Sequence, residues 1–278
     1  MVRRPLGNHL DGPDTLLVTS DATSDATPGA HAGAVTGAVT GANEIETLRE
    51  LITRARVVLW DFDGPICRLF AGHRAERVAA DLVEWLARQG LRGLLTESER
   101  ATLDPQVVLR AVGRRHPGSD LVAELEERLT REEERAAASA LPTAYADPLI
   151  RTWTALGARL AVTTNNSPRA TRAYLDSRGL ADCFTPHLYG RTRDLHHLKP
   201  DPHCLHRALH ATGTAPAAAL MIGDSPTDLD AAREAGVPFL GYARTEGQEK
   251  HLRAAGATHV VRSLEPVLRL LRGGPPVR

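Results

Sequence analysis

Short apolar runs alternate with amphipathic segments over most of residues 57–272. Each run is rich in aliphatic residues and is bounded by polar residues or glycine, which is typical of buried strands. These runs predict strands at 57–60, 159–164, 187–190, 218–223, 237–242 and 259–261. The segments between them have helical spacing, and several begin at a polar residue followed by proline, as at Ser167-Pro168. Repeated βα units predict an α/β fold with a parallel sheet covered by helices on both faces.

Residues 71–140 break this alternation because no strand pattern occurs within them. The first helical run closes at Gly90, a suitable residue just beyond a helix. Asp104-Pro105 is an N-cap followed by a first-turn proline, and Ser119 caps a long charged segment. The segment therefore predicts a small helical subdomain, inserted into a core formed by residues 43–70 and 141–278.

Residues 1–42 contain no aromatic residue and carry two short repeats, SDATSDAT and GAVTGAVTGA. A stretch of this composition buries too little apolar surface to offset the entropy of ordering it, so we expect a disordered tail. Asn43 with Glu46 three positions later forms an N-cap pattern. The first helix is therefore predicted to begin at Asn43.

Composition limits the classes of partner and the cellular environment that we expect for the protein. The formal net charge is zero and no block of five or more basic residues occurs, which argues against nucleic acid or an anionic membrane surface. No apolar run reaches the ~18 residues of a membrane span, and the N-terminus lacks the apolar core of a secretory signal. Three widely spaced cysteines favour a reducing cytoplasm over a disulfide framework. Monomer and homodimer remain open.

Polar residues follow the predicted strands at the edge where parallel sheets bind ligands. Asp61 and Asp63 come directly after the strand at 57–60, and two such carboxylates can attack an electrophile and shuttle a proton. Thr164-Asn165 follows the second strand and precedes a helix, an arrangement that suits an anion. The sequence therefore predicts a catalytic crevice beside Asp61.

Three further residues complete the predicted crevice. Asp224 and Asp228 flank a helix start after the strand at 218–223, and carboxylates gathered there would repel one another without a cation. Oxygen ligands of this kind suit Mg²⁺. Lys199 is one of only two lysines among 34 basic residues, so its position before Pro200 is informative. It can supply a point charge to a phosphate or to the nucleophile.

Four segments, taken in chain order, resemble the motifs of the haloacid dehalogenase superfamily. They are DFDG at 61–64, VTTN at 162–165, Lys199-Pro200, and GDSPTD at 223–228. The resemblance covers about residues 56–262 and extends to the phosphoglycolate phosphatase-like members of subfamily I. It implies a Rossmann-like core with an inserted α-helical cap that closes over the site.

The resemblance also implies roles for individual residues. Asp61 is similar to the nucleophile that forms an aspartyl-phosphate, and Asp63 to the general acid and base. Thr164 and Lys199 resemble the groups that hold the transferring phosphoryl. The implied Mg²⁺ ligands are Asp61, Asp63 through its backbone carbonyl, Asp224 and Asp228, the last in a supporting position.

Two neighbours of the nucleophile refine the expected chemistry. Asp63 favours phosphoryl transfer over carbon–halogen cleavage, because only the former has a leaving oxygen that needs a proton. Pro65 departs from the family pattern, which usually has threonine there, and proline offers neither a hydroxyl nor an N–H. We therefore expect an altered loop after Asp61.

The function predicted is a Mg²⁺-dependent phosphatase of a small phosphorylated metabolite. Asn165, His73 and Arg68 are candidate substrate-binding residues, although His73 also fits a solvated residue where the cap begins. A phosphomutase would retain every motif and differ in the cap. A non-catalytic binding or regulatory protein with the same fold is the third alternative.

Overall fold

The computed structural model describes residues 33–273, with side chains from residue 44 onward. The chain divides into two units, Met1–Ala42 and Asn43–Arg278, and the description below concerns the second. The predicted disordered tail lies outside the described residues over 1–32. Helix α1 spans Gly33–Arg54, so the prediction that Asn43 begins the first helix is wrong. No proline interrupts the chain between Gly33 and Asn43, and nothing there obliges the helix to stop.

The core is a six-stranded parallel sheet in the order β5-β4-β1-β6-β7-β8. The strands are β1 (Val57–Trp60), β4 (Arg159–Thr163), β5 (Leu188–Tyr189), β6 (Ala219–Gly223), β7 (Phe239–Tyr242) and β8 (Val260–Val261). All four residues of β1 are buried, as expected of a central strand covered on both faces. The strand predictions and the α/β fold class are confirmed.

Side chains of β1 alternate between two cores, one on each face of the sheet. Val58 and Trp60 join a core built with α1, α6 (Ala146–Ala155), α7 (Pro168–Ser177), α8 (Ala181–Phe184) and α12 (Glu265–Arg272). Val57 and Leu59 join the other, built with α9 (His203–Thr212), α10 (Pro226–Glu234) and α11 (Glu246–Ala254). This period of two is the pleat of a strand. The sheet is thus held rigidly from both sides.

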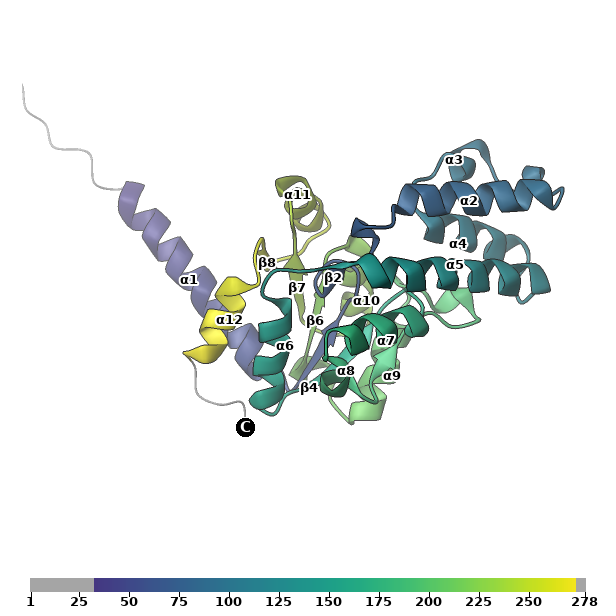
Figure 1. The fold of residues 1–278 in the computed structure, drawn as a ribbon. Coiled ribbons are helices and arrows are strands. Elements are labelled where there is room, and N and C mark those ends of the chain that lie inside the picture. The colour runs from purple at the N-terminus through teal and green to yellow at the C-terminus, as the bar shows by residue number, and fades with distance from the viewer. Residues whose placement is uncertain (1–32, 274–278) are drawn as a thin grey trace, which may run out of the picture. The chain divides into compact units, whose positions relative to one another are not determined.

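The helices between β1 and α6 gather on one side of the sheet (Figure 1). Their buried side chains form an apolar core of their own. These helices are α2 (Ala75–Arg88), α3 (Glu97–Arg100), α4 (Pro105–Arg115) and α5 (Asp120–Ser139). The side chains of Asp104 and Ser119 cap α4 and α5 as predicted. We refer to this segment as the cap.

Two short strands link the cap to the core. They are β2 (Cys67–Arg68) and β3 (Leu141–Pro142), which pair antiparallel and were not predicted. Single 3₁₀ turns occur at Leu69–Ala71, Arg92–Leu94, Leu195–His197 and Pro216–Ala218. No helix in the described part of the chain has the length and apolar character that crossing a membrane requires.

The register of the three central strands aligns their carboxyl ends. Trp60, the last residue of β1, pairs with Val162 of β4 on one side and with Ile222 of β6 on the other. The polar residues that follow these strands therefore emerge at one edge of the sheet.

Candidate active site

The Lys199 side chain contacts groups from three different segments of the core. Its ammonium lies 2.7 Å from Asp61 Oδ1 and 2.5 Å from Asp228 Oδ1, and it donates to the Thr163 carbonyl at 2.8 Å. These three acceptors use all three N–H groups of the ammonium. Lys199 is 2% exposed, so it fixes the Asp61 carboxylate from a buried position.

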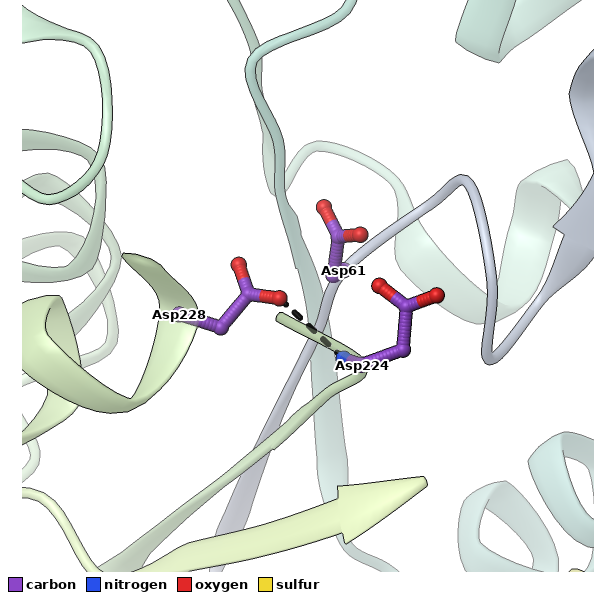
Figure 2. Close-up of side chains that lie close together, drawn as sticks. All are labelled: Asp61, Asp224 and Asp228. Atoms are coloured by element: carbon purple, nitrogen blue, oxygen red, sulfur yellow. Dashed lines mark hydrogen bonds between the residues drawn. The ribbon is translucent and has the colours of Figure 1, made fainter. Parts of the chain in front are cut away.

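Asp228 holds the loop between β6 and α10. Its Oδ2 accepts from the backbone N–H of Asp224 and of Ser225, each at 3.1 Å, and from the Ser225 hydroxyl at 2.8 Å. Ser225 is the N-cap of α10 and forms a capping box with Asp228. Figure 2 shows the bond from Asp228 to the Asp224 backbone. Both oxygens of Asp228 are thus engaged by protein groups. Asp228 therefore supports the site by holding this loop and Lys199 in place.

Asp224 occupies the space that a side chain at residue 64 would need. A Cβ built on Gly64 would lie 2.3 Å from Asp224 Oδ2, and the φ of Gly64 is +130°. Both facts require glycine at this turn. The absent side chain allows the loop after Asp61 to pack directly against the Asp224 carboxylate.

Asp61, Asp224 and Asp228 together form what we call the carboxylate cluster (Figure 2). One carboxylate oxygen from each lies within 4.8 Å of the others. Three carboxylates face a single ammonium, so the cluster retains excess negative charge. Its all-oxygen donor set and this excess charge fit a hard divalent cation such as Mg²⁺.

Burial opposes this concentration of charge. It raises the pKa of Asp61 and raises that of Asp224 well above the usual carboxyl value, and the charges of Asp228 and Asp63 raise both pKa values further. Burial alone would lower the pKa of Lys199, but the ion pairs with Asp228 and Asp61 outweigh it and raise the pKa. The protein thus keeps its cation charged beside carboxylates that resist ionisation together.

Asp63 lies apart from the carboxylate cluster but borders the same cleft. Its Oδ1 accepts from the Leu69 N–H at 2.8 Å, and burial raises its pKa to about 6. A raised carboxyl pKa suits a group that must give up and regain a proton. The buried Pro65 follows in a loop closed by the Gly64 N–H, which donates to the Cys67 carbonyl at 2.6 Å, so the turn does not depend on an N–H from residue 65.

The loop after β4 supplies Thr164 and Asn165. Asn165 borders the cleft, and its side-chain amide bonds both backbone groups of Lys199, accepting from the N–H at 2.8 Å and donating to the carbonyl at 3.2 Å. The buried Thr164 hydroxyl instead donates to Asn166 Oδ1 at 3.0 Å. The structure therefore brings Asn165 to the cleft and directs the Thr164 hydroxyl along its own loop.

His73 and Arg68, the other two predicted substrate-binding residues, are not among the described residues that border the cleft. His73 Nε2 lies 2.7 Å from Glu132 Oε2 on α5, and Arg68 belongs to β2, where it pairs with Leu141. Both lie where the cap joins the core.

The cleft itself has a volume of about 380 Å³ and lies between the sheet edge and the cap. Asp61, Asp63 and Lys199 face it from the core, whereas Gln106 and Arg110 face it from α4. Arg110 was not predicted, although its spacing of four from Gln106 places both on one face of a helix. Its Nη2 donates to the Lys199 carbonyl at 2.7 Å, so it contacts core and cap together.

A second buried ionic group, which we call the anchor cluster, lies beside the site and was also not predicted. Its centre is Arg191, whose side chain has no exposed surface. The partners of Arg191 are Glu133 at 2.9 and 2.8 Å, Glu126 at 3.0 Å, Thr130 at 3.0 Å and the Asn165 carbonyl at 3.0 Å.

Glu133 connects the anchor cluster to the core. Its carboxylate accepts from the Asn166 side chain and from the Ser167 N–H, each at 2.9 Å. Because Glu133 belongs to α5, these bonds tie the cap to the loop that holds Lys199.

Comparisons with known proteins identify the family and the fold. A family model described as haloacid dehalogenase-like hydrolase matches residues 55–236. A curated phosphoglycolate phosphatase from Rhodospirillum rubrum is 42% identical over 113 residues, covering 39% of this chain and 45% of the relative. Another, from Thiobacillus denitrificans, is 42% identical over 99 residues, covering 34% and 43%. The chain thus spans less than half the length of these curated relatives.

Solved structures show the same fold at low sequence identity. A predicted phosphoglycolate phosphatase from Haemophilus somnus matches with a TM-score of 0.58 and 16% identity, covering 78% of this chain and 98% of that one. CbbY from Rhodobacter sphaeroides, solved with phosphate, matches with a TM-score of 0.56 and 21% identity, covering 75% and 94%. The resemblance in the motifs and the likeness in fold therefore lead to one family.

Proposed function

We propose, since the chain belongs to the haloacid dehalogenase-like hydrolase family, that it is a Mg²⁺-dependent phosphatase acting through an aspartyl-phosphate on Asp61. The observation that supports this most is the placement of Asp61. Asp61 directly follows β1, and its side chain borders the cleft. Its carboxylate lies 2.7 Å from a buried ammonium and belongs to a cluster that fits a divalent cation. A nucleophile and the positive charge to bring it to an anionic phosphate are thus side by side.

The proposed reaction uses these residues in two steps. A carboxylate oxygen of Asp61 attacks phosphorus, and the bond from phosphorus to the leaving oxygen breaks. Asp63 donates its proton to that oxygen and then takes a proton from water. The water attacks phosphorus, which releases inorganic phosphate and restores Asp61.

Other residues bind the reacting groups. The charge of Lys199 attracts the phosphoryl group, although its three N–H groups are already engaged, and we propose that the Thr164 hydroxyl binds a phosphoryl oxygen. Asp61, the Asp63 carbonyl and Asp224 would hold Mg²⁺, with Asp228 in support. When bound, Mg²⁺ supplies positive charge that stabilises the transferring phosphoryl group.

The substrate we propose is a small phosphate monoester, with 2-phosphoglycolate first because two curated relatives carry that name. The cleft of about 380 Å³ suits a molecule of this size. Asn165 borders the cleft and remains a proposed substrate contact. His73 and Arg68 remain proposals at the junction of cap and core. Confining the reaction under a cap keeps bulk water from the phosphoryl group.

The decisive experiment measures phosphate release by the full chain from a panel of phosphate monoesters, with Mg²⁺ and with chelator. We expect turnover that needs Mg²⁺ and that Asp61→Asn abolishes. Asp230→Asn is the matched control, because Asp230 lies exposed on α10 and pairs only with Arg233 among described contacts. Turnover that persists in Asp61→Asn or in chelator contradicts the proposal, and isomer formation from a sugar 1-phosphate favours the phosphomutase.

Two further proposals concern the protein in the cell. The three cysteines are free, and Cys67 and Cys204 are buried, which supports the expected reducing, cytoplasmic environment. A monomer or homodimer is expected, and sedimentation analysis of the full chain distinguishes them.

A further inference from the structure

The cleft contains two cations among its described residues, Lys199 and Arg110. They differ in how many donors remain available. Every N–H of the Lys199 ammonium already has an acceptor within the protein. Binding any additional anionic group therefore falls to Arg110 or to backbone donors.

Arg110 is underused in this structure. Of its five N–H donors, one at Nη2 meets the Lys199 carbonyl at 2.7 Å. Its Nε is buried and has no partner, which is costly for a group of a cationic side chain. Burial lowers the pKa of Arg110, yet a guanidinium remains charged at neutral pH. Among the described contacts, the charged guanidinium therefore has one acceptor for its five donors, and it lies beside the cleft.

The position of Arg110 indicates which part of a substrate it meets. Asp61 binds phosphorus from the sheet edge, so the leaving alcohol extends away from the core. Arg110 is on α4, the cap helix that borders the opposite side of the cleft. Its bond to the Lys199 carbonyl holds it against the cleft instead of the outer surface of the cap.

The charges around the cleft limit the second anionic group. Asp61, Asp63, Asp104 and Asp228 all border it, so a second dianionic phosphate would meet strong repulsion. A carboxylate carries a single charge and matches the planar fork of a guanidinium with two parallel hydrogen bonds.

Resting on the proposed function, we propose that Arg110 determines specificity by binding a carboxylate on the leaving alcohol. The enzyme then prefers phosphate monoesters of small hydroxy acids. Neutral or cationic alcohols of the same size lack this contact and leave the remaining donors of Arg110 without a partner, which lowers their rate.

Three esters of similar size test the proposal: 2-phosphoglycolate, ethyl phosphate and O-phosphoethanolamine. Steady-state kinetics are measured with Mg²⁺ for the wild type, Arg110→Met and Arg110→Lys. We expect Arg110→Met to lower kcat/KM for phosphoglycolate by about 10- to 100-fold, the value of a charge-assisted contact. Ethyl phosphate should change less than about threefold, and Arg110→Lys should recover part of the loss.

Arg114→Met is the matched control, because Arg114 is on the same helix, more exposed, and paired with Glu99. It should leave all three rates unchanged. Equal losses on all esters in Arg110→Met would overturn the proposal, since they would mean that Arg110 acts only through Lys199. A wild-type preference for the neutral or cationic ester would overturn it too, while leaving the phosphatase function intact. Absence of Mg²⁺-dependent turnover of all three esters would overturn both.

Discussion

The carboxylate cluster and the anchor cluster both bury a cation among carboxylates, yet their charges balance differently. In the carboxylate cluster, one ammonium faces Asp61, Asp224 and Asp228, with Asp63 nearby. In the anchor cluster, each of the five N–H groups of Arg191 has an acceptor. The first cluster has three carboxylates for one cation, whereas the second has two, of which Glu126 is partly exposed to solvent.

This difference separates function from structure. A buried ionic group with every donor and acceptor satisfied holds segments together, and removing one member leaves a charge stranded. A buried group with excess charge of one sign needs a ligand of the other sign and costs stability until it binds one. Substitutions in the two clusters should therefore have opposite effects on activity and stability.

The largest effect is expected for Asp61→Asn. Loss of the nucleophile should lower kcat by at least about a thousandfold. The free energy of unfolding should stay the same or rise, because the substitution removes one of several mutually repelling carboxylates while Asp228 still pairs with Lys199. Phosphate release and urea unfolding on the same preparation check both expectations. A clear loss of stability would erase the distinction between the clusters.

Glu133→Ala should have the reverse effect on stability, a clear loss. It strands the buried Arg191 guanidinium and two donors at Asn166 and Ser167, which should cost about 3–5 kcal/mol of stability in urea unfolding. The double variant Glu133→Leu with Arg191→Met removes both charges and should recover much of that loss. If the double variant is as unstable as the single one, the stranded charge is not the cause.

The next largest effect is expected from the binding of Mg²⁺, which should stabilise the folded protein. A ligand at 100 times its Kd stabilises the folded state by about 2.7 kcal/mol, so Tm should rise as Mg²⁺ is titrated. Asp224→Asn should weaken this rise without destabilising the apo protein, because it relieves repulsion. The double variant of the anchor cluster should keep the rise, and its loss there would show that the clusters are not independent.

The sequence predicted one of these clusters and missed the other for a physical reason. Asp61 and Asp224 directly follow strands, Asp228 lies in the first turn of the next helix, and parallel strands bring such ends together. Lys199 was informative because the chain has only one other lysine. Arg191 belongs to an arginine-rich chain, and its partner Glu133 comes from a helix far away in sequence. Only the folded chain identifies that pair.

Sequence proximity was a weaker guide than strand order. His73 and Arg68 follow Asp61 closely in sequence, but neither borders the cleft, although their neighbours Phe70 and Ala75 do. Arg110 is farther along the chain and borders the cleft because α4 turns one face toward it. The central strands were predictable since burial on both faces demands continuous apolar runs. The start of α1 was not, because capping signals do not exclude a longer helix.

The smallest effect is expected for Arg169→Met, which tests whether burial is what distinguishes the anchor cluster. Arg169 on α7 pairs with Glu127 and Glu134 of α5, at the same helix interface but in contact with solvent. Water screens these charges and solvates whichever partner remains, so Tm should not change measurably. A loss comparable with that of Glu133→Ala would mean that any ion pair across this interface suffices, and that the burial of Arg191 contributes nothing special to holding the cap.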